Sequence, residues 1–219
     1  MVGPEVHPRL TGHAPTAPVF AVPYHRQGPT PGMLLIGGGW RFGEGSAVKA
    51  RHGIGHTERH WPVEPWNRIE PGLWMGGHLW ADGTGTVHRA VVTEEFDLVI
   101  SLHSSSCHGP APSVEHLVHP IPDGPLTAPQ LGRVIELAAV AADSVRDGRS
   151  VLVRCLNGYN RSGLVVAQCL IELGLDSAAA VDLIRARRSP RALSNDVFLQ
   201  YLTTGLDIAK VLSSLDTWA

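Results

Sequence analysis

From residue 66 onward, short apolar runs alternate with amphipathic segments in which apolar positions recur every three to four residues. Phe96–Leu102 is an apolar run of strand length, which is typical of a strand buried on both faces of a sheet. Further strands are predicted at Leu73–Met75, Val114–Ile121 and Val151–Val153. Residues 78–90 are polar and contain glycine, so a loop with a short helix is expected there.

A long amphipathic helix is predicted from Thr127 to about Arg146. Thr127 is a good N-cap, Gln130 completes a capping box three residues later, and Asp147-Gly148 ends the helix. Three further helical segments are predicted at residues 163–173, 177 to about 187, and 195 to about 215. Ser194 is a suitable N-cap for the last of them.

Strands that alternate with helices indicate an α/β fold, in which right-handed crossovers pack the helices against the sheet. We therefore expect an open, mostly parallel sheet of four or five strands with helices on both faces. Sites in such sheets lie at the carboxyl ends of the strands. The 219 residues suffice for one such domain, expected at residues 61–219, with an N-terminal extension at residues 1–60.

The extension is rich in proline, glycine and histidine, which is typical of irregular structure, and only Met33–Ile36 has the character of a short strand. Its glycine clusters do not form a nucleotide loop, because Lys49 is not preceded by glycine or followed by Ser or Thr. His52, His56 and His60 have a spacing that could bind metal on a helix. The glycines between them disfavour a helix, so solvated histidines are the better interpretation.

Composition narrows the class of protein. Hydrophobic residues make up 43% of the chain and charged residues 17%, so a buried core is feasible. A net charge of −2 gives no electrostatic signal for nucleic acid or a membrane surface. No run reaches the roughly 20 apolar residues of a membrane helix, and the N-terminus lacks a signal-peptide pattern. Three cysteines without a framework-like spacing fit a reducing compartment, so a cytoplasmic protein is expected.

Candidate chemistry is concentrated in residues 151–163, VLVRCLNGYNRSG. A strand ends at Cys155 and a helical pattern follows Arg161, so the intervening backbone N–H groups form an anion-binding loop at a helix N-terminus. Such an environment lowers a cysteine pKa from about 8.5 toward roughly 3.5–7.5, and Cys155 is therefore expected as a thiolate. Arg161 adds a planar fork suited to two phosphate oxygens. Together these groups indicate phosphoryl transfer through a cysteine.

Cys155–Ser162 matches the pattern C-x5-R-[ST], and the sequence resembles the cysteine-dependent protein tyrosine phosphatase superfamily, most closely its compact dual-specificity branch. The resemblance spans about residues 66–210 in the family's order. It is carried, besides the motif, by residues 69–77, 96–102, 121–123 and 192–198. It implies a metal-independent phosphomonoester hydrolase without cofactors. The expected substrate is a phosphorylated protein, with phosphotyrosine favoured and phosphoserine or phosphothreonine tolerated, or a small phosphomonoester.

The roles follow from this chemistry and from the resemblance. Cys155 is expected to attack phosphorus and form a cysteinyl phosphate, while Arg161 holds the phosphate oxygens. The resemblance gives Ser162 a hydrogen bond to the sulfur that eases breakdown of the intermediate. It also makes Asp123 the general acid and then the general base, although Asp-Gly is equally an ordinary turn. Phosphate-binding backbone is expected at Leu156, Asn157, Gly158, Tyr159, Asn160 and Arg161.

One position departs from the family pattern, because Arg154 stands where the family usually has histidine. This departure keeps open a phosphate-binding pseudophosphatase without turnover. Gly158–Ser162 also resembles the loop of RNA 5′-triphosphatases from messenger-RNA capping, which need no aspartate acid. The near-neutral charge counts against that alternative.

Several other residues carry two interpretations. Cys169 is expected in the core, whereas Cys107 is either a loop residue or a redox partner of Cys155. Asn195 is either a helix cap or a residue that braces the cysteine loop, as the family resemblance implies. Four arginines form a basic stretch that is read first as a solvated helix face and second as a substrate or lipid contact: Arg185, Arg187, Arg188 and Arg191.

Overall fold

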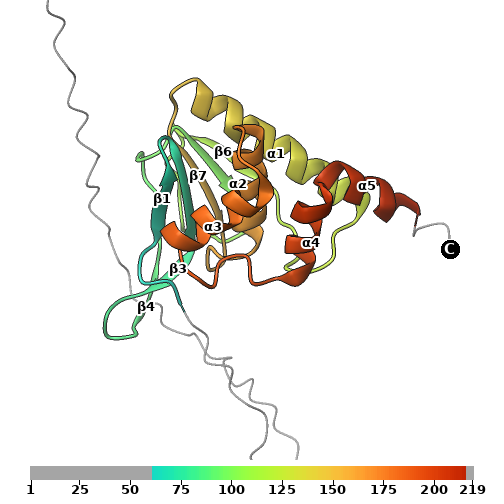
Figure 1. The fold of residues 1–219 in the computed structure, drawn as a ribbon. Coiled ribbons are helices and arrows are strands. Elements are labelled where there is room, and N and C mark those ends of the chain that lie inside the picture. Colours follow the sequence, from blue (N-terminus) through green and yellow to red (C-terminus); the bar gives the residue numbers. More distant parts are fainter. Residues whose placement is uncertain (1–60, 216–219) are drawn as a thin grey trace, which may run out of the picture.

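A computed structural model describes residues 61–215 (Figure 1). Its strands are β1 (Trp66–Glu70), β2 (Leu73–Gly77), β3 (Leu79–Ala81), β4 (Val87–Arg89), β5 (Leu98–Ser101), β6 (Glu115–Val118) and β7 (Val151–Cys155). Its helices are α1 (Ala128–Arg146), α2 (Arg161–Glu172), α3 (Ser177–Arg187), α4 (Asp196–Thr204) and α5 (Leu206–Leu215). The strand, turns and histidines predicted within residues 1–60 lie outside the described residues.

Five strands form the main sheet, in the order β1-β2-β7-β5-β6. Only β1 runs antiparallel to its neighbour, so the predicted open, mostly parallel α/β sheet is confirmed. Every residue of β7 is buried, as expected for a central parallel strand. Gly77 pairs with Cys155 and Ser101 pairs with Arg154, which brings the carboxyl ends of β2, β7 and β5 to one edge.

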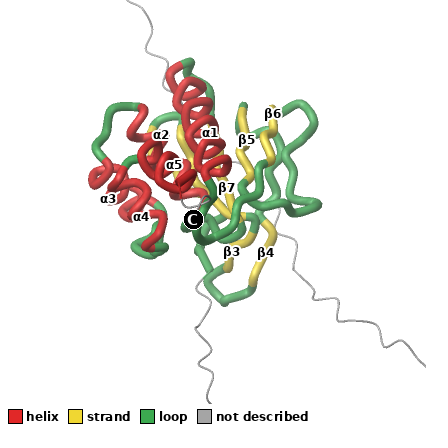
Figure 2. The backbone as a smooth tube through the Cα atoms, turned by 90° about the vertical axis from the view of Figure 1, so that its right-hand side faces the viewer, coloured by secondary structure: helices red, strands yellow, loops and turns green. Residues whose placement is uncertain are grey.

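The two faces of the sheet are covered differently. On the first face, Val151, Val153 and Cys155 belong to the large core cluster that also contains the buried residues of the helices. On the second face, Leu152 packs with Val92, Phe96 and other residues from strands and loops, and this cluster contains no helix residue. Figure 2 shows the helices gathered on one side of the sheet. The expectation of helices on both faces is therefore corrected, because irregular backbone supplies the apolar cover of the second face.

The bounds of helix α1 agree with the helix predicted from Thr127 to about Arg146. Thr127 is its N-cap, and Gln130 Oε1 accepts the Thr127 N–H at 2.9 Å as part of a capping box. Leu131, Val134 and Leu137 are at most 1% exposed, and burial of each stabilises the fold by roughly 1.5–3 kcal/mol. Among residues 61–215, no helix has the length and apolar character needed to cross a bilayer.

Residues 78–90 are not a loop with a short helix, because β3 and β4 form an antiparallel hairpin there. The reason is the side chain of Asp82, whose Oδ1 accepts the backbone N–H groups of Thr84 (2.8 Å) and Thr86 (3.1 Å) and so organises the turn. Its other oxygen lies 2.7 Å from His88 Nε2. Local side-chain bonding of this kind has no signature in apolar periodicity.

The last predicted helix is divided into α4 and α5. Gly205 separates them with a φ of +90°, a conformation that an L side chain rarely adopts. The N-cap of α4 is Asn195 rather than Ser194, since Asn195 Oδ1 accepts the N–H groups of Val197 (3.0 Å) and Phe198 (3.4 Å).

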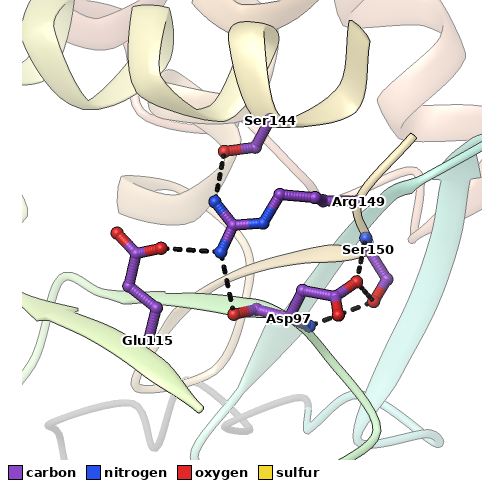
Figure 3. A network of polar contacts seen from close by, with 5 residues as sticks. All are labelled: Asp97, Glu115, Ser144, Arg149 and Ser150. Atoms are coloured by element: carbon purple, nitrogen blue, oxygen red, sulfur yellow. Dashed lines mark hydrogen bonds and ion pairs between the residues drawn. The ribbon is translucent and has the colours of Figure 1, made fainter. Parts of the chain in front are cut away.

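A polar network lies at the amino end of β7, opposite the edge that carries Cys155 (Figure 3). Arg149 donates to Glu115 Oε2 at 2.6 Å, to the Asp97 carbonyl at 3.2 Å and to Ser144 Oγ at 3.4 Å. Ser150 donates its N–H and its hydroxyl to Asp97 Oδ2, each at 2.7 Å. These bonds join α1, β6 and the segments that lead into β5 and β7, so the network is structural.

Candidate active site

Cys155 is the last residue of β7, and its side chain lies on the helix-covered face of the sheet. The side chain is 3% exposed. Its Sγ accepts the Gly158 N–H at 3.3 Å and lies 3.4 Å from the hydroxyl of Ser162, in the first turn of α2. The Gly158 N–H and the Ser162 hydroxyl, both from the segment Cys155–Ser162, which we call the cysteine loop, are thus in contact with the sulfur.

The carbonyl groups in the middle of the cysteine loop point away from the sulfur. Arg188 donates its Nε–H to the Gly158 carbonyl at 3.0 Å and an Nη2–H to the Asn157 carbonyl at 3.2 Å. In a trans peptide the N–H points opposite to the C=O. The N–H groups of Gly158 and Tyr159 are therefore turned toward the inner side of the loop, which agrees with the Gly158 N–H bond to Cys155 Sγ.

The flanking carbonyls are held in the same way. The Leu156 carbonyl accepts the N–H groups of His78 (2.8 Å) and Leu79 (3.1 Å), and the Tyr159 carbonyl accepts the Leu193 N–H at 3.3 Å. The same geometry turns the N–H groups of the next residues inward. Four consecutive peptides thus offer donors on one side, which is the arrangement that binds an anion at a helix N-terminus.

Gly158 allows the cysteine loop to touch the end of β2. Its φ is +68°, and a Cβ atom built there would lie 2.3 Å from the backbone of Gly76 and 2.7 Å from Gly77 N. A Cβ on Gly77 would lie 2.7 Å from the backbone of Asn157. These close backbone contacts require glycine both in the cysteine loop and at the end of β2, and they fix the position of the loop relative to the sheet.

Arg161 reaches from the start of α2 toward the segment Ile121–Gly124, which we call the acid loop. Its Nη1 donates to the Ile121 carbonyl at 3.5 Å. Its Nε is buried and has no hydrogen-bond partner among the described residues. A buried N–H without an acceptor is costly, and an oxyanion in the cysteine loop is the acceptor that this guanidinium fits.

Asp123 lies exposed in the acid loop and is joined to the cysteine loop by two amides. Its Oδ1 accepts from Asn195 Nδ2 at 3.2 Å, and its Oδ2 accepts from Asn160 Nδ2 at 3.5 Å. Asn160 Oδ1 in turn accepts the N–H groups of Ser194 (2.9 Å) and Asn195 (3.2 Å). The side chain of Asn160 thereby connects the acid loop, the cysteine loop and the start of α4.

Arg188 is a residue of the site whose burial the sequence interpretation missed. It is 8% exposed, and besides the loop carbonyls it donates to the Glu64 carbonyl at 2.9 Å and to Asn67 Oδ1 at 2.6 Å. Burial lowers its pKa to about 10. Its position four residues after the buried Ile184, on the same face of α3, is the signal that could have found it.

The solvated-face interpretation of the basic stretch is also corrected at Arg185, which is half-buried and donates to the carbonyls of Ala192 (3.2 Å) and Leu193 (3.0 Å). Arg187 and Arg191 are exposed, in agreement with that interpretation.

Arg154 points to the second face of the sheet, because side chains alternate along a strand and Cys155 occupies the first face. It is 1% exposed and donates to Ser101 Oγ (2.9 Å) and to the carbonyls of His108 (2.9 Å) and Gly109 (2.6 Å). Burial lowers its pKa to about 10. Arg154 therefore ties β7 to the segment after β5 rather than contacting Cys155 Sγ.

The other two cysteines differ in burial. Cys169 is fully buried in the core, as predicted, and burial raises the pKa of its thiol to about 12. Cys107 is exposed, and both it and Cys155 are free thiols. Within residues 61–215, no three or more His, Cys, Asp or Glu side chains are grouped so that they could hold a metal ion.

The chain is similar to a curated protein and to several solved structures. Cyclin-dependent kinase inhibitor 3 of Rattus norvegicus is 33% identical over 102 residues, which cover 45% of this chain. The chain spans about half, 47%, of that relative's length. The crystal structure of human DUSP28 is 26% identical with a TM-score of 0.52, covering 66% of this chain and 95% of that chain.

A mouse chain assigned to the dual specificity phosphatases, crystallised with zinc tungstate, is 30% identical with a TM-score of 0.48. That match covers 68% of this chain and 92% of the mouse chain. No protein-family model matches the sequence.

Proposed function

Because this chain belongs to the cysteine-dependent protein tyrosine phosphatase superfamily and resembles its dual-specificity branch, we propose that it hydrolyses phosphomonoesters through a cysteinyl phosphate. The observation that carries the proposal is the pair of groups in contact with Cys155 Sγ, the Gly158 N–H at 3.3 Å and the Ser162 hydroxyl at 3.4 Å. These contacts support a nucleophilic role for the sulfur. Phosphorylated proteins, phosphotyrosine before phosphoserine or phosphothreonine, are the proposed substrates.

In the proposed first step, the Cys155 thiolate attacks phosphorus while the ester oxygen leaves with a proton from Asp123. The inward N–H groups of the cysteine loop and the guanidinium of Arg161 hold the three non-bridging oxygens as charge shifts in the transition state. In the second step, Asp123 takes a proton from water, which attacks phosphorus and releases phosphate. Ser162 donates to the departing sulfur.

The two alternatives are less well supported. An RNA triphosphatase of the capping type needs no aspartate acid, whereas Asp123 is here attached to the cysteine loop through Asn160. The pseudophosphatase alternative arose from Arg154, and that side chain lies on the face of the sheet opposite to Cys155. Hydrolysis of a phosphoester is therefore preferred to both.

The test is hydrolysis of a series of aryl phosphates that differ in the pKa of the leaving phenol. We expect Cys155→Ser to abolish turnover, because a serine hydroxyl at this position is not ionised. We expect Asp123→Asn to lower kcat by about 10²–10⁴-fold for poor leaving groups and much less for good ones, as loss of a general acid requires.

Matched controls are Cys107→Ser, an exposed cysteine, and Asp182→Asn, an exposed aspartate on α3. Both should retain wild-type rates. Equal effects of Asp123→Asn on all leaving groups would remove Asp123 from the acid role. Turnover by Cys155→Ser at the wild-type rate would refute the proposed nucleophile. Release of phosphate from triphosphate-ended RNA but not from phosphotyrosine peptides would favour the capping-type alternative.

A further inference from the structure

A polar pocket of about 450 Å³ lies on the second face of the sheet. Its walls are Arg154 and Ser101 in the sheet, His116 and Val118 on β6, and the segment His103–Ser106 after β5, with His78 after β2. The pocket includes no residue of the acid loop and none of residues 155–162. Its volume is that of a small-molecule site.

Arg154 brings an uncompensated charge to this pocket. Its three hydrogen bonds end on neutral oxygens, those of Ser101, His108 and Gly109, and no carboxylate within residues 61–215 forms an ion pair with it. The pocket walls contain no Asp or Glu. Buried charges in proteins are normally matched by an opposite charge. An anion in the pocket would supply the opposite charge that residues 61–215 do not provide.

The polar groups around Arg154 are also suited to binding an anion. Arg154 Nε donates to Ser101 Oγ, which lies 2.9 Å from His116 Nε2. In the tautomer in which His116 Nε2 accepts the Ser101 hydroxyl, the Nδ1–H of His116 is free to act as a donor. His103 Nδ1 lies 3.0 Å from Ser105 Oγ in the segment after β5. The pocket thus combines one buried cation with hydroxyl and imidazole donors.

We propose that this pocket is a second anion-binding site, and that it binds a small phosphate-type oxyanion, either free phosphate or the phosphate of a small ester. Arg154 would supply its two remaining N–H groups to the oxygens, in the planar geometry that suits phosphate. The pocket shares no lining residue with the cysteine loop, although His103 lies near enough to Arg161 to be affected by its charge. It gives a role to the residue that stands where the family usually has histidine.

The histidines give the proposal a direct readout. Burial lowers the pKa of His116 and of His103, and the positive charges of Arg154 and Arg161, respectively, lower them further. A bound dianion reverses this electrostatic effect, so both pKa values should rise when the pocket is occupied. His88, on the β3–β4 hairpin, does not line the pocket and serves as the internal reference.

The experiment uses the full chain with Cys155→Ser and Arg161→Ala, which removes turnover and the guanidinium clamp of the cysteine loop. Inorganic phosphate is titrated at constant ionic strength while the imidazole NMR signals are followed. The expected result is saturable binding that shifts His116 and His103 but not His88. A second titration with glycerol 3-phosphate shows which source fits: tighter binding than phosphate identifies small esters, and weaker binding identifies free phosphate.

Two further variants decide whether Arg154 and its pocket are responsible. Val118→Glu places a negative charge at the half-exposed wall and should weaken binding at least about fivefold, whereas Val63→Glu, an exposed control away from the pocket, should change it less than about twofold. Arg154→Gln should abolish saturable binding. A response that is linear in phosphate, or equal affinities of the Val118→Glu and Val63→Glu variants, would overturn the proposal. Comparison of Val118→Glu with Val63→Glu tests the location of the binding site even if Arg154→Gln does not fold.

Discussion

The direction of the peptides in the cysteine loop depends on one side chain, that of Arg188. It comes from the end of α3 and occupies the carbonyls of Asn157 and Gly158, so that the following N–H groups face inward. The same guanidinium is bonded to the Glu64 carbonyl and to Asn67 Oδ1 before and within β1. Arg188 is therefore a positioning residue that holds the cysteine loop against β1 and the segment before it.

This role predicts a specific effect of Arg188→Lys. Lysine keeps the charge but not the planar fork, so it cannot hold both loop carbonyls and the β1 acceptors at once. We expect kcat for an aryl phosphate to fall by about 10²-fold, since displacement of a catalytic group by about 1 Å has effects of this size. KM should change less, because the charge of Arg161 remains.

The measurement is steady-state kinetics, with circular dichroism to establish that the variant is folded. Arg187→Lys is the matched control, because Arg187 is exposed and adjacent. A folded Arg188→Lys variant with the kcat of the wild type would contradict the positioning role.

At the scale of single residues, the candidate reactive groups could be located from the sequence, whereas the residues that support them could not. Cys155, Arg161 and Ser162 are recognisable because their chemistry is local to one short motif. The contacts of Arg188 with Glu64 and of Asn160 with Ser194 join residues far apart in the chain. Such contacts have no periodicity or spacing rule, and only the packing of α3 and α4 against the cysteine loop creates them.

At the scale of elements, the network at the amino end of β7 joins β5, β6 and β7 through residues that are far apart in the chain. Asp97 precedes β5, Ser150 precedes β7, and Arg149 reaches Glu115 on β6 (Figure 3). The N–H and the hydroxyl of Ser150 hold the pKa of the Asp97 carboxyl below its usual range. The charged form of Asp97 is thus preferred in the folded protein.

Stability should depend on pH through this carboxylate. A pKa that is lowered on folding contributes stability above the unfolded value of about 3.9, and this contribution is lost as the pH falls through the lower folded value. We expect Asp97→Asn to reduce the free energy of unfolding by about 0.5–1 kcal/mol at pH 7, because the group is exposed.

The difference between wild type and Asp97→Asn should disappear in acid, where the wild-type carboxyl is also neutral. Urea unfolding at a series of pH values checks this, with Asp182→Asn as an exposed control that should show no pH-dependent difference. A difference that persists unchanged after the wild-type carboxyl has been protonated would assign the effect to geometry rather than charge.

The elements themselves were predictable where apolar periodicity or capping was strong. Strands β5 and β7 and helix α1 are examples, since burial of Val99, Leu152 and Leu137 dictates their pattern. The β3–β4 hairpin was not predictable in this way, because the bonds of Asp82 hold its turn. The break before α5 depends on the backbone conformation of Gly205. The sequence does not reveal this break, because the pattern of apolar residues is helical on both sides of it.

At the scale of the whole molecule, the described residues contain their own hydrophobic core. The main cluster extends from Ile69 to Ala209 and includes the wall behind Cys155. We expect a chain that begins at residue 61 to unfold cooperatively and to hydrolyse aryl phosphate with a kcat/KM within about twofold of the full chain. Circular dichroism during urea unfolding and steady-state kinetics check this. Loss of cooperative unfolding would refute the proposed boundary between residues 60 and 61.

The central claim is that phosphorus is transferred to the sulfur of Cys155. The most direct measurement is mass spectrometry of protein that has been quenched during turnover of an aryl phosphate. Ser162→Ala is the suitable variant, because we expect loss of the hydroxyl 3.4 Å from Sγ to slow breakdown of the proposed intermediate. We predict that the peptide with Cys155 gains one phosphoryl group and that Cys155→Ser gains none. Turnover without phosphate on that peptide, or with phosphate on another residue, would contradict the mechanism.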